Sequence, residues 1–87
     1  MDAALLKPFL EEKSKTRDIL RLAVEVEEND PHKRQWGWEW HDVRAHPASL
    51  MKLVVAGIIR VASKSNRYTM YLLDDRLAVK KALSPNR

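Results

Sequence analysis

The chain has no cysteine and only two glycines among its 87 residues. Without cysteine there are no disulfides and no thiolate metal sites, and an intracellular, cytoplasmic location is favoured. The isolated glycines, Gly37 and Gly57, exclude a glycine-rich phosphate-binding loop. Long hydrophobic runs are also missing, since none approaches the roughly 20 residues of a membrane span. The opening MDAALLKPF lacks the pattern of a signal peptide. We therefore expect no contact with a membrane.

Acidic residues are absent from one long stretch of the chain. Between Val43 and Leu73 there is no Asp or Glu, and there are five basic residues: Arg44, Lys52, Arg60, Lys64 and Arg67. All twelve acidic residues lie outside this stretch. The net charge of +4 is modest, so the segregation of charge, more than its total, indicates a polyanionic partner.

The residues that are present are typical of a small globular protein. Apolar residues make up 45% of the chain and charged residues 32%. This composition is too apolar for a disordered chain, and the length suits one domain spanning residues 1–87.

The first third of the chain is predicted to be helical. Residues 2–12 carry apolar positions at helical spacing, but Pro8 lies inside the pattern, so a short or broken helix is expected. Ser14 or Thr16 then offers an N-cap for a second helix that runs to about Asn29.

Three tryptophans alternate with other residues in the segment QWGWEW, which has the period of a strand. One interpretation is a platform on which unpaired bases stack, formed by Trp36, Trp38 and Trp40. The other is structural: two rings cover the core and one is partly exposed. The structural interpretation is favoured because the chain has little else of this size to bury.

The second half of the chain predicts a helix followed by a β-hairpin. After a short helical stretch at 41–45, a third helix is expected from Pro47 to Ala56, with an inner stripe of Leu50, Leu53, Val54 and Gly57. Gly57 supplies a left-handed stop. The predicted strands cover 58–63 and 68–73, the loop between them is 64–67, and a last helix starts at Asp74 or Asp75 and ends near Leu83.

This order of elements resembles the winged helix-turn-helix superfamily over about residues 15–75. The most specific match is LMKLVVAGIIR, residues 50–60, which has the family's leucine, glycine and basic spacing across the recognition helix and first wing strand. Tyr71-Leu72-Leu73 matches the end of the second wing strand. The resemblance implies an α+β, mostly helical fold: a winged helix-turn-helix with a short N-terminal strand, a C-terminal β-hairpin wing and extra helices at both ends.

The resemblance also implies DNA binding, with the third helix at the major groove and the wing on the phosphate backbone. Double-stranded DNA is expected more than single-stranded DNA. The role would be that of a small transcriptional regulator, or of an accessory domain in a replication or repair protein such as a helicase, with a homodimer or a larger host protein as further partner. The candidate nucleic-acid-binding residues are Arg44, His46, Ser49, Lys52, Arg60, Lys64, Ser65, Asn66 and Arg67.

The outer face of the third helix leaves an alternative open. It presents Ala48, Met51, Lys52 and Val55, with no Arg, Asn or Gln for bidentate base readout. Such a face suits a protein contact at least as well. In that alternative the chain is a protein-interaction or dimerisation module, with a surface made of Met51, Val55, Tyr68 and Met70.

No pattern in the chain indicates catalysis, a cofactor or a metal site. The three histidines, His32, His41 and His46, include no pair at the i, i+4 spacing that places two imidazoles on one helical face. No serine or threonine lies in a recognised nucleophile motif. We therefore expect a non-enzymatic protein.

Overall fold

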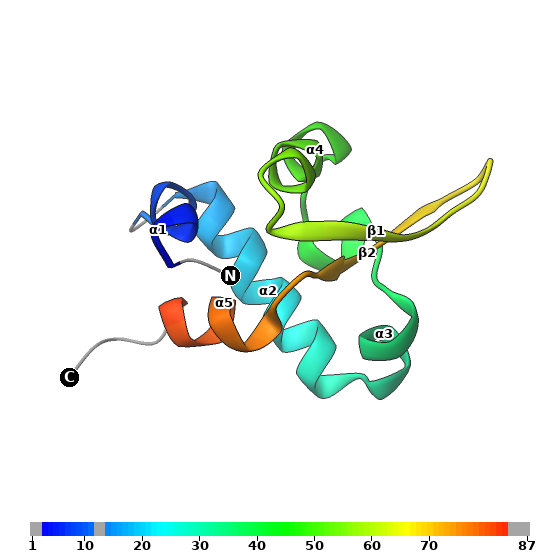
Figure 1. Cartoon of the computed structure of the whole chain (residues 1–87). Coiled ribbons are helices and arrows are strands. Elements are labelled where there is room, and N and C mark those ends of the chain that lie inside the picture. The colour runs from blue at the N-terminus through cyan, green and yellow to red at the C-terminus, as the bar shows by residue number, and fades with distance from the viewer. Residues whose placement is uncertain (1–2, 12–13, 84–87) are drawn as a thin grey trace.

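The computed structural model describes residues 3–11 and 14–83. Figure 1 shows a body of helices from which a β-hairpin projects. The elements, in chain order, are α1 (Ala3–Leu6), η1 (Lys7–Phe9, a 3-10 helix), α2 (Lys15–Asn29), α3 (Pro31–Trp36), η2 (Trp40–Val43, also 3-10), α4 (Pro47–Val55), β1 (Ile59–Lys64), β2 (Thr69–Leu73) and α5 (Arg76–Leu83). The chain is thus α+β and mostly helical, as predicted.

The first turns are short and broken, as expected from Pro8. The proline lies in the first turn of η1, where its missing N–H costs no hydrogen bond. The hydroxyl of Thr16 donates to the carbonyl of Phe9 at 2.8 Å and ties this segment to the start of α2. The predicted ends of this helical region, Asp2 and Glu12, lie outside the described residues.

Helix α2 is the longest element and carries the core. The Ser14 hydroxyl accepts a hydrogen bond from the N–H of Arg17 at 3.2 Å and begins the helix at the predicted position. Ile19, Leu20 and Ala23 form its buried stripe. This face of α2 packs against α3, η2, β2 and α5.

A short helix that was not predicted, α3, follows α2 directly. The Asp30 carboxylate accepts from the N–H groups of His32 and Lys33, at 3.0 and 3.3 Å, and so starts a new helix at Pro31. Gly37, with φ of +112°, ends it after six residues.

The predicted N-terminal strand is reduced to a single residue. Trp38 forms one antiparallel bridge with Tyr71, in which each backbone N–H donates to the other's carbonyl at 2.9 and 2.8 Å. The strand cannot extend because α3 occupies the residues before Gly37 and η2 begins at Trp40. The tryptophan alternation predicted a strand through this segment and gave no sign of the helical turns on either side of Trp38.

The prediction that two of the three tryptophan rings cover the core was also wrong. Trp38 is fully buried and stacks at a tilt on Tyr71, with ring centroids 5.6 Å apart. Trp36 and Trp40 are 57% and 49% exposed. One ring therefore belongs to the core and two lie at the surface.

Helix α4 and the hairpin agree closely with the prediction. Leu50 and Leu53 are completely buried, whereas Gly57, expected on the same stripe, is exposed and serves as the left-handed stop with φ of +80°. The strands pair antiparallel from Ile59 opposite Leu73 to Lys64 opposite Thr69, with a bulge between Val61 and Ser63. Within β1 only Ile59 is buried, because the hairpin extends beyond the helical body (Figure 1).

One buried carboxylate connects the layers of this core. Glu27 of α2 is 2% exposed, and its Oε2 accepts hydrogen bonds of 2.8 Å from both Trp38 Nε1 and the backbone N–H of Leu73. Its Oε1 lies 3.9 Å from Nη1 of Arg76. The side chain thereby joins α2, the bridge residue, β2 and α5. Among the described residues no helix is long and apolar enough to cross a membrane.

Replacing Glu27 by Ala is expected to lower the free energy of unfolding by about 3 kcal/mol, because two buried N–H groups lose their acceptor. Urea denaturation followed by circular dichroism measures this. Glu27→Gln should keep most of the stability, since an amide oxygen can accept the same bonds. The matched control is Glu25→Ala on the exposed side of α2, which should change stability by less than about 0.5 kcal/mol. Equal losses for Glu25 and Glu27 would contradict the linking role.

Candidate nucleic-acid interface

The loop at the end of the hairpin has a defined conformation. The N–H of Ser65 donates to the carbonyl of Tyr68 at 2.8 Å, and the Ser65 hydroxyl accepts from the N–H groups of Arg67 and Tyr68 at 3.2 and 3.3 Å. These bonds hold the four-residue turn closed. Lys64, Asn66 and Arg67 project from it as exposed side chains.

The five predicted cations form no ion pair with a described residue. In the part of the chain that the structure describes, no carboxylate lies within ion-pairing distance of Arg44, Lys52, Arg60, Lys64 or Arg67, and the ion pairs there involve other basic residues. Lys64 and Arg67 therefore do not fold back onto the acidic residues of α2. They form a positive tip where β1 turns into β2, the end of the hairpin that projects from the helices in Figure 1.

Arg60 is separated from this tip. It lies at the base of the hairpin opposite Leu72, and it borders a hollow that also contains Arg34, Asp74 and Asp75. The prediction from sequence placed no acid near this arginine, because Asp74 and Asp75 follow the acid-free stretch. The turn that leads into α5 brings Asp74 and Asp75 close to Arg60.

The predicted residues before and within α4 form a second group. Arg44 is exposed in the left-handed conformation, with φ of +53°. The His46 ring accepts through Nδ1 from the N–H of Ala48 at 3.1 Å and so caps α4, while Ser49 is half-buried. Lys52 is exposed on the outer face.

The outer face of α4 is as apolar as predicted. Met51 is 55% exposed and Val55 80% exposed. Tyr68 and Met70, assigned with them to one alternative interface, belong to the hairpin and line a different surface.

Two hollows flank the hairpin loop. The first, about 390 Å³, lies between α3 and the hairpin and is lined by His32, Trp36, Glu39, Ser63, Tyr68 and Met70. The second, about 260 Å³, includes Trp40, Pro47 and the loop residues Ser65–Thr69. Glu39 and Tyr68 line both, so the hollows are neighbours. Glu39 was not among the predicted site residues, whereas Trp36 and Trp40 belonged to the base-stacking interpretation that the sequence analysis did not favour.

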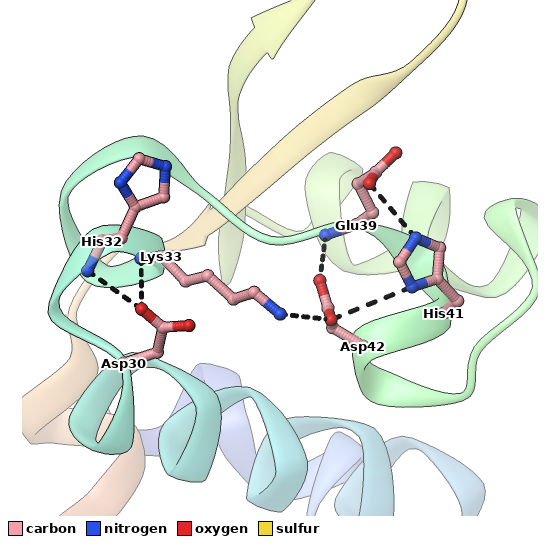
Figure 2. Close-up of polar contacts among 6 residues, drawn as sticks. All are labelled: Asp30, His32, Lys33, Glu39, His41 and Asp42. Carbon is pink, nitrogen blue, oxygen red and sulfur yellow. Dashed lines mark hydrogen bonds and ion pairs between the residues drawn. The ribbon is translucent and has the colours of Figure 1, made fainter.

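A polar network fixes the segment that carries Glu39. Lys33 Nζ lies 2.6 Å from Oδ1 of Asp42, and Oδ2 of Asp42 accepts from the N–H of Glu39 at 2.9 Å (Figure 2). The Glu39 carboxylate accepts in return from the backbone of Asp42, and its Oε2 lies 3.1 Å from Nε2 of His41. The network holds η2 against α3. Within the described ranges no three His, Asp or Glu side chains are placed to hold a metal ion.

The same contacts shift two pKa values. The hydrogen bond to Asp42 raises the pKa of Lys33 above 10.5 and outweighs the opposing effect of burial. Burial acts to raise the pKa of Asp42, but hydrogen bonds from Lys33 and the Glu39 backbone outweigh it and hold that pKa below 3.8. Both groups are therefore charged at neutral pH.

Comparison of the chain with protein-family models, with curated protein sequences and with solved structures finds no match.

Gly37 sets the distance between Trp36 and the hairpin, and its replacement tests that contact. A Cβ at this position would lie 2.9 Å from Cβ of Met70 and 3.1 Å from the carbonyl oxygen of Tyr71. Gly57 also has positive φ, but a Cβ there meets no atom within 4 Å. Gly57→Ala should therefore cost about 1 kcal/mol of backbone strain, and Gly37→Ala about 1–2 kcal/mol more in urea denaturation. Equal costs would show that the close approach is unimportant.

Asp42→Asn is expected to lower stability by about 1 kcal/mol at neutral pH. Because the pKa of Asp42 is depressed, its ionised form stabilises the fold above pH 3.8, and this contribution is lost as the pH falls through the folded-state value. The difference in unfolding free energy between the wild type and Asp42→Asn should therefore disappear in acid. Urea denaturation at neutral pH and below pH 3.8 measures it. Asp18→Asn, at a side chain 63% exposed, is the control; a gap that persists in acid would contradict the assignment.

Proposed function

We propose that this chain is a winged-helix module that binds DNA, with the hairpin as its wing. The order α2, Trp38 bridge, η2, α4 and hairpin supports the proposal, because these elements follow one another as in the superfamily that the sequence resembles. In this proposal α4 is the recognition helix, and α1, α3 and α5 are additions.

The positive tip of the hairpin, Lys64 and Arg67, is the observation that carries the proposal. Both side chains are exposed and have no carboxylate partner among the described residues, and the hairpin that carries them projects from the helical body (Figure 1). A cation held away from internal acids gives its full charge to an external anion. The exposed amide of Asn66 adds a neutral donor between them. Phosphate oxygens accept hydrogen bonds from such side chains whatever the base sequence of the DNA.

Helix α4 contributes modestly in this proposal. Its exposed face has Lys52 for a phosphate and Ala48 or Val55 for a thymine methyl group, but it has no side chain suited to bidentate base readout. The module would therefore bind with little sequence preference. This suits an accessory domain of a DNA-processing protein, or a small regulator that gains specificity by pairing with another protein.

A second candidate function rests on the exposed face of α4. Met51 and Val55 are large apolar side chains more than half exposed, at adjacent turns of one helix. A protein partner, including a second copy of this chain, would cover them. This candidate requires no role for the positive tip.

The double variant Lys64→Ala, Arg67→Ala should weaken duplex binding and flatten its salt dependence. Each lost phosphate contact reduces the slope of log affinity against log salt by about 0.9, so the pair should reduce it by about 1.8. Fluorescence anisotropy with a labelled duplex at several salt concentrations measures both effects.

The matched control is Lys15→Ala, Lys81→Ala, which removes the same charge from exposed residues on helices away from the hairpin. It should leave the slope nearly unchanged. Equal effects of the two double variants would show that net charge alone drives binding. Absence of salt-sensitive binding by the wild type, together with a dimer that Val55→Asp dissociates, would favour the protein-interaction function.

A further inference from the structure

Three exposed aromatic rings lie around the hairpin loop. Trp36, Trp40 and Tyr68 are 57%, 49% and 46% exposed. Trp36 and Tyr68 line the first hollow, and Trp40 and Tyr68 line the second. Single exposed apolar residues are ordinary in proteins, but three aromatic rings gathered on two adjoining hollows form a concave surface.

The fold holds these rings outward for a structural reason. The bridge to Tyr71 and the bond to Glu27 fix Trp38 inside the core. A continued strand would place Trp36 and Trp40 on the same face as Trp38, but Trp36 ends α3 and Trp40 begins η2, and these helical turns leave both rings at the surface. Gly37 brings the backbone close to Met70 and Ala62 of the hairpin. The rings are thus supported by rigid elements on both sides.

The first hollow also presents polar groups beside the rings. The Glu39 carboxylate, oriented by His41 and by the backbone of Asp42, is an acceptor at its edge. The His32 ring lines the same hollow. A carboxylate accepts from the exocyclic amine of a base, and an imidazole offers one donor and one acceptor.

The charges on this surface distinguish between its possible ligands. Asn66 and Arg67 line the second hollow, and Lys64 is the residue before the loop that carries them. Glu39 is the one carboxylate among the described lining residues of the two hollows. Aromatic faces beside backbone-tracking cations are the combination that binds single-stranded nucleic acid. An acidic peptide would contact the cations, and a neutral peptide would contact the rings. A nucleic-acid strand contacts both, because each nucleotide has a phosphate and a base.

We infer that the two hollows hold successive unpaired bases of a single-stranded nucleic acid, stacked on Trp36, Tyr68 and Trp40, with the phosphates against Lys64 and Arg67. The inference rests on the proposed function, because it uses the same cations. It changes the expected ligand from duplex alone to a strand with unpaired bases, as at a junction or an unwound end. In a duplex both faces of a base are covered by its neighbours, so these rings have nothing to stack on.

The test compares a labelled oligothymidylate of about 12 nucleotides, within the usual site size for such proteins, with a duplex of equal length. Fluorescence anisotropy is measured for the wild type, Trp36→Ala and Tyr68→Ala. Each substitution should weaken single-strand binding about tenfold, the typical loss of one stacked base, and should leave duplex binding within about twofold. Trp36→Phe, which keeps an aromatic face, should recover most of the affinity.

Two controls accompany these variants. Leu77→Ala removes an exposed apolar side chain, 68% exposed, from α5 and should change neither affinity. Circular dichroism confirms that each variant is folded. A second readout is tryptophan fluorescence, which the oligonucleotide should quench less in Trp36→Phe than in the wild type.

The outcomes distinguish this inference from the proposed function. Loss of binding in Lys64→Ala, Arg67→Ala, with unchanged single-strand affinity in both ring variants, would overturn the base-stacking inference and leave the phosphate contacts standing. Unchanged binding to both ligands in the double cation variant would overturn the proposed function itself. No binding of the single strand by the wild type at low salt would also refute the inference. Saturable binding of a proline-rich peptide, abolished by Trp36→Ala, would in that case identify a peptide groove.

Discussion

The Glu27 carboxylate is the contact on which the arrangement of this small protein depends. A buried charge is costly unless its oxygens are fully used, and here one oxygen accepts two short hydrogen bonds while the other faces the Arg76 guanidinium. These partners come from three separate parts of the chain. The geometry that satisfies the carboxylate therefore fixes Trp38 and the end of β2 against α2 at the same time.

The surface features follow from that internal constraint. With Trp38 held inside, the helical turns of α3 and η2 on either side leave Trp36 and Trp40 at the surface, and Gly37 lets the chain approach the hairpin closely enough to form a hollow with Tyr68. The hairpin then projects because only its base meets the helices. Lys64 and Arg67 have no carboxylate partner within the described part of the chain for the same reason. A core contact thus organises both the aromatic and the charged parts of the proposed interface.

This combination changes how the proposed interface would work. A conventional reading of the helix-turn-helix resemblance places specificity on α4, yet the face of α4 is apolar and η2, the helix before it, is a single 3-10 turn. The aromatic and basic residues instead gather around the hairpin loop. In the proposed function the wing is therefore the principal contact, and the outer face of α4 remains available to a protein partner.

The sequence by itself determined the elements whose signals are local. Apolar spacing, the Ser14 cap, the Gly57 stop and the alternation of 58–73 predicted α2, α4 and the hairpin to within about two residues, as such patterns normally do. The acid-free stretch likewise identified the exposed cations of the loop, because the distribution of charge along the chain can be seen in the sequence alone. Helix α3 was missed because its cap, Asp30, also served as the stop of the helix before it.

Only the tertiary structure decided which tryptophan is buried, since that depends on Glu27 and Tyr71 meeting Trp38 from distant positions. It also brought Glu39 beside the cationic loop and the acids Asp74 and Asp75 beside Arg60. These neighbours are far apart in the chain, and no periodicity encodes them. Local patterns specify which residues form a helix or a strand, whereas the surfaces between elements exist only once the core has set their positions.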